Sequence, residues 1–188
     1  MHAQAYLTSR DGNGKCHENI PVWVDLNPRV QERARQEIDA CCGADRSPTW
    51  SDFAAIPYIN CIIKEGMRWR PVAVTSLPHR ARADDKYEGM FIPKDTTVFI
   101  ATWAIHHLDS IYQDSDKFNP DRYLDHQKLA NDYAGTSDYS MRDYYNYGAG
   151  RRICPGIHLA ERNMWRMAAK LLWAFEFSPP YDPVTGKE

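Results

Sequence analysis

The residue with the clearest potential for chemistry in this 188-residue chain is Cys154, which follows a loop broken by two glycines. Gly148 and Gly150 can adopt positive φ, so the loop can turn sharply and bring its backbone close to a ligand. Pro155 suits the first position of a helix, and the pattern therefore predicts Cys154 at a helix N-terminus. Unpaired N–H groups and the helix dipole favour an anion there. A cysteine held as thiolate in this way can serve as an axial ligand to haem iron.

The predicted helix after the cysteine is amphipathic. Apolar residues recur along it with helical spacing and form one stripe, made of Ile157, Ala160, Met164, Met167, Leu171 and Phe175. This stripe predicts which face of the helix is buried.

The segment from Tyr147 to Gly156 resembles the cysteine-ligand loop of the cytochromes P450, which are haem-thiolate monooxygenases. That family's pattern is an aromatic residue, then Gly-x-Gly-x-Arg-x-Cys, then a glycine two residues later. Tyr147 stands where phenylalanine is usual and keeps the ring that packs beside the thiolate. The resemblance implies that Cys154 ligates the iron of a haem b cofactor. A lone cysteine without these neighbours is most often buried and inert.

A second motif, Glu65-Gly66-Met67-Arg68, falls in a helix predicted from Pro57 to about Trp69. Residues three apart share a helix face, so Glu65 and Arg68 can pair. The segment 118–123 resembles a further motif of the same family, and Arg122 is its arginine. The resemblance implies a buried structural triad of Glu65, Arg68 and Arg122 that braces the haem-binding core. Taken singly, these residues indicate only a solvated helix pair and a loop arginine.

Residues 77–101 resemble the small sheet of the family, with Pro-His-Arg and Ile-Pro-Lys signatures and turns at 88–89 and 93–95. Asp95 stands where the family usually has glycine, and aspartate tolerates turn geometry. The resemblance implies that His79 and Arg152 contact the haem propionates, which is chemically reasonable for a histidine and a cation. Considered alone, His79 indicates an ordinary histidine at a strand end.

The stretch that leaves the Glu65–Arg68 helix matches the part of the family that borders the substrate. Its apolar residues Val72, Val74 and Leu77 suggest an apolar organic substrate.

The four motifs occur in the family's order, and the resemblance runs from about residue 28 to residue 177. It implies a mostly α fold with a small β-sheet, the C-terminal part of the cytochrome P450 fold. A helix is predicted from Pro28, with Gly43 as its stop. Residues 28–188 are assigned to this portion and residues 1–27 to no known segment. The chain is shorter than a cytochrome P450, so we expect a fragment without the distal proton-delivery residues, and no catalytic residue is assigned.

Composition is that of a folded protein, with 43% apolar and 26% charged residues. The net charge of −2 and the lack of a recognised motif argue against nucleic-acid binding. No apolar run reaches the roughly 18 residues of a membrane span. The resemblance implies the cytosolic face of the endoplasmic reticulum for a full-length family member, whereas this chain, without an anchor, is expected to be cytoplasmic. The five cysteines have no metal-binding spacing, which suits a reducing compartment.

The resemblance implies insertion of one oxygen atom from O₂ into an organic substrate, with electrons from NADPH through an NADPH-cytochrome reductase. Basic residues near the predicted ligand could dock that flavoprotein by electrostatic steering, and they are Arg151, Arg152, Arg162, Arg166 and Lys170. A solvated helix face explains the last three equally well. An alternative is a non-catalytic remnant that keeps the motifs but binds no haem. A third hypothesis, a redox or metal protein using Cys41 and Cys42, lacks Cys-x-x-Cys spacing.

Overall fold

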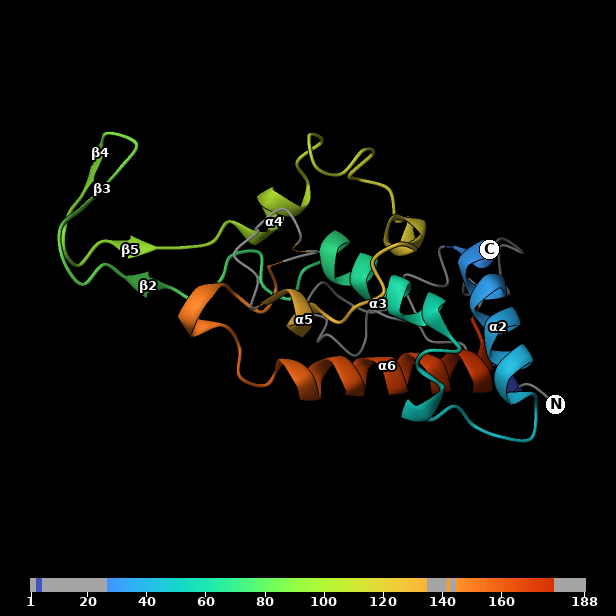
Figure 1. Cartoon of the computed structure of the whole chain (residues 1–188). Coiled ribbons are helices and arrows are strands. Elements are labelled where there is room, and N and C mark those ends of the chain that lie inside the picture. Colours follow the sequence, from blue (N-terminus) through green and yellow to red (C-terminus); the bar gives the residue numbers. More distant parts are fainter. Residues whose placement is uncertain (1–2, 5–26, 135–141, 143–144, 178–188) are drawn as a thin grey trace, which may run out of the picture.

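Three helices form the core of the protein in the computed structural model, which describes residues 3–4, 27–134, 142 and 145–177. They are α2 (Pro28–Cys42), α3 (Pro57–Trp69) and α6 (Ile157–Ala174) (Figure 1). All of α3 from Tyr58 to Arg68 is buried. Its apolar side chains join those of α2 and α6 in one hydrophobic cluster. The helix that carries the Glu-x-x-Arg motif is therefore the centre of the fold.

The bounds of α2 and α3 follow from proline and glycine chemistry. Both helices begin with proline, whose fixed φ and missing N–H suit the first helical position. Gly43 ends α2 with a φ of 61°, and its N–H donates to the Asp39 carbonyl at 3.0 Å. The predicted start and stop of α2, and the predicted range of α3, are confirmed.

The α6 helix differs from the prediction in two ways. It begins at Ile157, because Pro155 and Gly156 form a turn before it. Met167 is 38% exposed, so its place on the buried stripe is wrong. The buried face follows a slightly different set of positions, namely Ile157, Glu161, Met164, Trp165, Ala168, Ala169 and Leu172.

Glu161 shows why the pattern of apolar residues did not identify the buried face of α6 correctly. Its carboxylate is buried and accepts the N–H groups of Ala130 at 2.6 Å and Asn131 at 3.4 Å. Both N–H groups belong to the first turn of the short helix α5 (Ala130–Ala134), where N–H donors lack partners within the helix. A polar side chain on the inner face of α6 thus holds a neighbouring element.

Short strands form two-stranded ladders rather than one continuous sheet among the described residues. The antiparallel pair β2 (His79–Arg80) and β5 (Thr97–Val98) leads to the hairpin β3 (Asp85–Tyr87) and β4 (Met90–Ile92), which extends away from the helices (Figure 1). A parallel pair joins β1 (Ala3–Gln4) to β6 (Phe175–Glu176). The mostly helical architecture with small sheets is as predicted.

The predicted turns of the arm formed by β2 to β5 are confirmed. Gly89 has a φ of 82° in the hairpin turn, and Asp95 has a φ of 69° in the turn before β5. Aspartate is one of the few side chains that tolerate the left-handed region. Its presence at position 95 is therefore compatible with the turn that glycine would make.

Shorter segments connect these parts. They are η1 (Trp50–Asp52), α4 (Thr102–His106), η2 (Pro120–Tyr123) and η4 (Gly150–Arg152). The η2 turn packs directly on α3. Among the described residues, no helix has both the length and the apolar composition that crossing a bilayer requires.

Candidate functional site

The Cys154 loop is a tight turn that ends just before α6. Gly148 and Gly150 take positive φ values of 78° and 64°, as the sequence predicts. The Tyr147 carbonyl accepts the Cys154 N–H at 2.8 Å and so closes the loop. The Cys154 thiol is free and half-buried. A Cβ at Gly156 would lie 3.7 Å from its sulfur, so the glycine keeps that side of the thiol uncovered.

The relation of Cys154 to the helix is looser than predicted. Because α6 begins at Ile157, two residues, Pro155 and Gly156, separate the cysteine from the helix. Its carbonyl accepts the Ile157 N–H at 3.4 Å. This contact ties the backbone of Cys154 to the first turn of α6 and fixes where the loop delivers the side chain.

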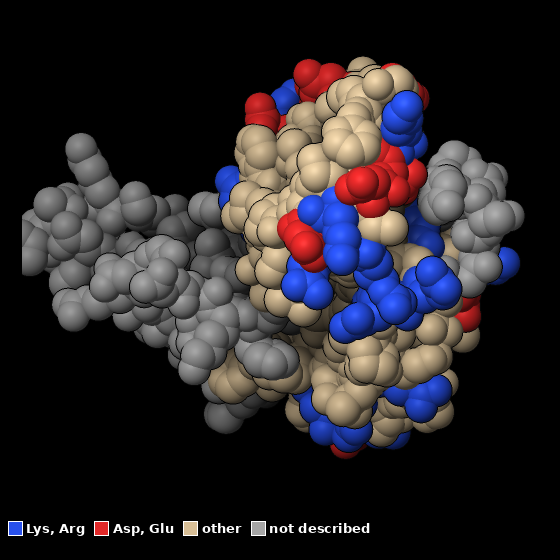
Figure 2. Space-filling model, turned by 90° about the vertical axis from the view of Figure 1, so that its left-hand side faces the viewer, with Lys and Arg blue, Asp and Glu red and all other residues tan. Residues whose placement is uncertain are grey.

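The two residues expected near the propionates lie on different elements. Arg152 is exposed on η4, two positions before the cysteine, and His79 is exposed on β2 opposite Val98. Within the described residues, no hydrogen bond or ion pair joins them to each other. Lys and Arg side chains gather on the face of the molecule at the end formed by η4 and the β2–β5 arm (Figure 2). Asp and Glu side chains lie on the same face, and Arg80 of the arm pairs with Asp95 at 3.4 Å, so part of this positive charge is balanced.

Glu65 and Arg68 form a bidentate ion pair in the interior. Arg68 Nε lies 2.7 Å from Glu65 Oε2 and Arg68 Nη2 lies 2.8 Å from Glu65 Oε1. Both side chains are 0% exposed. Arg122 reaches Glu65 Oε1 through its Nε at 3.4 Å. The three side chains that the sequence singled out thus meet in one buried network that joins α3 to η2.

The remaining hydrogen-bonding capacity of this pair is used by the backbone. Arg68 Nη1 donates to the carbonyls of His106 and Ser115, each at 2.9 Å, and the Asn119 N–H donates to Glu65 Oε1 at 2.8 Å. Burial alone would lower the pKa of Arg68, but the hydrogen bonds and charge of Glu65 outweigh it and raise that pKa above its usual value. A buried ion pair is stable only when its other donors and acceptors are satisfied in this way.

The apolar residues expected to face substrate lie between α3 and β2. Val72, Val74 and Leu77 are all exposed, and Leu77 is 82% exposed. The Val74 carbonyl accepts the Trp103 N–H at 2.9 Å, which ties this stretch to α4. The backbone is therefore fixed while the apolar side chains remain available for contact.

Two site residues escaped the sequence reasoning. His106 is buried, and its Nε2 accepts the Tyr145 N–H at 2.9 Å. Asn146 Nδ2 donates to the Met67 carbonyl at 2.7 Å. Both bonds hold the segment that leads into the Cys154 loop. They join positions 39 and 79 residues apart, so no local pattern could reveal them.

His106 leads to a prediction about pH. Burial, and after it the charges of Arg68 and His107, lower the pKa of its imidazole from 6.5 to about 4. Between these values the unfolded chain binds more protons than the folded chain. The free energy of unfolding should therefore rise with pH through this window, by up to about 3 kcal/mol, and the contribution is complete above it.

Urea denaturation of the wild type and of His106→Gln, repeated across this pH window, measures the effect. Burial raises the pKa of Glu161, which acts in the opposite direction, so the difference between the two proteins is the relevant quantity. A difference in unfolding free energy that does not change with pH would contradict the prediction.

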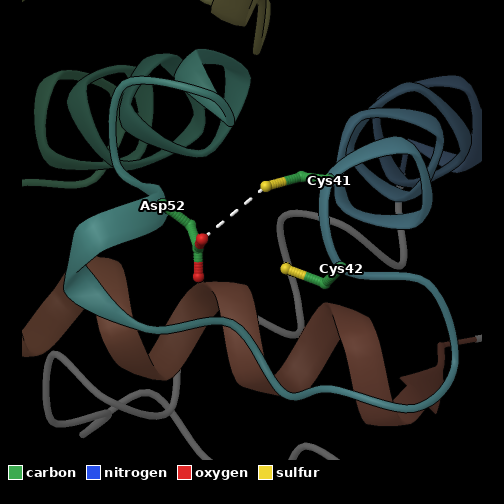
Figure 3. A group of neighbouring side chains, drawn as sticks. All are labelled: Cys41, Cys42 and Asp52. Carbon is green, nitrogen blue, oxygen red and sulfur yellow. Dashed lines mark hydrogen bonds between the residues drawn. The ribbon is translucent and has the colours of Figure 1, made fainter.

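A second cluster brings Cys41, Cys42 and Asp52 together, with their ligand atoms within 4.8 Å of one another (Figure 3). The Asp52 carboxylate already accepts hydrogen bonds from Arg46 at 2.7 and 3.0 Å and from the Thr49 N–H at 2.8 Å. Burial and the hydrogen bond with Cys41 raise the pKa of Cys42 to about 11. A carboxylate held by a guanidinium beside a protonated thiol favours a structural link between α2 and η1 over the third hypothesis of a metal or redox centre.

Comparison with known proteins agrees with this arrangement. A family model described as Cytochrome P450 matches residues 23–186. The cytochrome P450 monooxygenase yanC of Aspergillus niger is 56% identical over 157 residues, which are 84% of this chain and 29% of that protein. The monooxygenase macC of Penicillium terrestre is 56% identical over 155 residues, which are 82% of this chain and 29% of that protein. The chain thus spans under a third of these fungal relatives.

Solved structures give the same result. A zebrafish cytochrome P450 with abiraterone superposes with a TM-score of 0.75 at 31% identity, and the match covers 88% of this chain and 37% of that one. A family match over most of the sequence accompanies the structural features described above. These are the helical core, the cysteine loop with its two positive-φ glycines, and the buried Glu-x-x-Arg network. The chain belongs to the cytochrome P450 family.

Proposed function

We propose that this chain is the haem-binding part of a cytochrome P450 monooxygenase, with Cys154 as the thiolate ligand of haem b. The observation that carries the proposal is the closed loop of Tyr147 to Cys154, in which both glycines take positive φ. That loop places a free, half-buried thiol beside a glycine and at the start of a core helix. When bound, a haem with a thiolate ligand activates O₂ for insertion of one oxygen atom into an organic substrate.

The donor set of the chain suits that cofactor. A cysteine thiolate is the soft ligand that would hold haem iron in this class of enzyme. Gly148 and Gly150 let the backbone approach the macrocycle, and the ring of Tyr147 would pack beside the sulfur. The exposed Arg152 and His79 would hold the propionates through charge-assisted hydrogen bonds. Glu65, Arg68 and Arg122 serve as a brace rather than as reacting groups.

An apolar organic molecule is the substrate class that the exposed side chains support. Val72, Val74 and Leu77 present aliphatic surface beyond the end of α3. Burial of such surface against a ligand is favourable by about 25 cal/mol per Å². The fungal relatives named above are monooxygenases, and we extend that activity to this chain as part of the proposal.

An NADPH-cytochrome reductase is the proposed electron donor. Three basic residues of α6 are exposed and could attract an acidic flavoprotein, namely Arg162, Arg166 and Lys170. Arg151 and Arg152 of η4 add positive charge just before the cysteine. For a full-length protein of this kind we propose a location at the cytosolic face of the endoplasmic reticulum.

The alternative, a non-catalytic remnant, is favoured by one observation. The described chain leaves many large apolar side chains exposed, including Val74, Leu77, Phe91 and Leu159. Exposed apolar surface of this extent marks an interface that another segment or protein covers, or a risk of aggregation. A chain whose apolar surface stays uncovered would hold haem poorly.

The 188 residues expressed alone are therefore expected to show poor solubility, weak haem uptake and no NADPH-dependent turnover. The reason is that this chain would supply the thiolate side of the cofactor and leave its other face open to water. Its exposed apolar side chains also favour aggregation. The measurement is the carbon-monoxide difference spectrum of the haem-supplied chain, followed by product analysis with reductase and a substrate panel. A stable thiolate-type spectrum with coupled turnover would show that this chain is self-sufficient. A longer protein that contains these residues and still binds no haem would favour the remnant.

A further inference from the structure

His106 is the last residue of α4, and both its backbone and its ring make hydrogen bonds in the interior. Its carbonyl accepts a hydrogen bond from Arg68 Nη1 at 2.9 Å. Its Nε2 accepts the backbone N–H of Tyr145, also at 2.9 Å. Since Nε2 is the acceptor, the neutral ring carries its proton on Nδ1. One residue thus contacts the buried ion pair on one side and the segment before the cysteine on the other.

The hydrogen bonds continue from Tyr145 into the loop itself. The Tyr145 carbonyl accepts the Gly148 N–H at 2.9 Å, and the Tyr147 carbonyl accepts the Cys154 N–H at 2.8 Å. Glycine has no side chain to pack, so the position of Gly148 depends on these backbone bonds. A continuous path therefore runs from Arg68 through His106 and Tyr145 to the turn that holds Cys154.

Asn146 provides a parallel tether, because its Nδ2 donates to the Met67 carbonyl at 2.7 Å. The two tethers act on adjacent residues but have different chemistry. Asn146 donates to α3, whereas the ring of His106 accepts from the backbone of Tyr145. Removing the acceptor leaves a partly buried N–H without its bond, which is more costly than losing a contact at the surface.

We propose that His106 is a positioning residue for the Cys154 loop. Its ring accepts the Tyr145 N–H while its carbonyl accepts a hydrogen bond from Arg68, and this double contact keeps the loop closed, with the Cys154 thiol half-buried. Among the described residues, the charged and titratable groups that act on the ring are Arg68 from α3 and His107, which directly follows α4. A cation on that side disfavours imidazolium, so the ring stays neutral and remains an acceptor. Presentation of the thiol to iron rests on the proposed function, but the positioning of the loop does not.

The test uses variants chosen by whether they keep a hydrogen-bond acceptor near the position of His106 Nε2. His106→Gln can place an amide oxygen near the former Nε2, His106→Asn is one methylene shorter and cannot, and His106→Leu has no acceptor. The control is His107→Leu, because His107 is the neighbouring histidine and stacks on Trp103 with ring centroids 4.2 Å apart. Two readouts need no haem: amide hydrogen exchange of residues 145–154, and the rate at which iodoacetamide labels Cys154, resolved by peptide mass spectrometry.

In the 188-residue chain we expect His106→Leu and His106→Asn to speed exchange at Gly148 and Cys154 by roughly tenfold, the effect of one lost hydrogen bond. Labelling of Cys154 should rise with it, while Cys61 in the core stays protected. His106→Gln and His107→Leu should behave like the wild type.

Equal exchange in the Asn and Gln variants would overturn the proposal, and this comparison remains available if His106→Leu does not fold. Faster exchange spread evenly over α3 and α6 would also overturn it, because that result describes general destabilisation. Neither readout involves haem, so a failure of Cys154 to ligate iron would refute the proposed function and leave this result standing.

Discussion

Cys154→Ala, made in a haem-loaded protein that contains this sequence, is expected to abolish the red-shifted carbon-monoxide band of the reduced haem. That band would depend on a cysteine thiolate as a ligand of the iron, and alanine offers no ligand atom. Cys154 lies in the closed glycine loop with a free thiol. Cys61 is fully buried in the hydrophobic core and cannot replace it. The measurement is the difference spectrum of the reduced protein with and without carbon monoxide.

The matched control is Cys41→Ala. Cys41 is also free and half-buried, but it lies at the end of α2 beside Asp52. This variant should keep the band at full intensity, because the change removes a thiol of similar exposure away from the loop. Persistence of the band in Cys154→Ala, or its loss in Cys41→Ala, would place the iron ligand elsewhere.

Glu65→Ala and Arg68→Ala are each expected to destabilise the protein by about 3–5 kcal/mol, since either change leaves a buried charge without its partner. A typical domain has only about 5–15 kcal/mol of stability. Arg68→Ala also frees the carbonyls of His106 and Ser115. The expected result is therefore loss of folded protein and of haem retention, not a change in rate alone. Urea denaturation and haem content per chain measure it.

The control for this prediction is an ion pair with the same spacing at the surface. Lys117 and Asp114 lie three residues apart at 3.2 Å, and their side chains are 74% and 58% exposed. Lys117→Ala should cost less than about 1 kcal/mol, because water and salt screen exposed pairs. If the substitutions in the buried and exposed pairs had equal effects, the Glu65–Arg68 pair would not be the brace of the core.

Several parts of this protein follow from local chemistry that is written in the sequence. Pro28 and Pro57 begin helices because proline suits the first helical position, and Gly43 ends one because it tolerates positive φ. The glycines of the Cys154 loop take positive φ for the same reason. These features depend on a residue and its immediate neighbours, so the element order and the cysteine loop could be predicted. The order of the motifs then indicated the family.

The long-range contacts needed the tertiary structure. Spacing alone could not tell whether Glu65 and Arg68 form a solvated pair or the buried network that is present. Spacing also placed Met167 on the buried face of α6, although Met167 is exposed. Glu161 is buried on that face, and its carboxylate accepts the Ala130 N–H at the start of α5.

Spacing could not reveal that His106 receives the Tyr145 N–H across 39 residues of chain. Local conformation is decided by each residue's own steric limits. Burial and hydrogen-bond partners are decided by which distant segments pack together. The sequence by itself therefore determined the elements and the turns of the Cys154 loop, and only the tertiary structure decided what holds that loop in place.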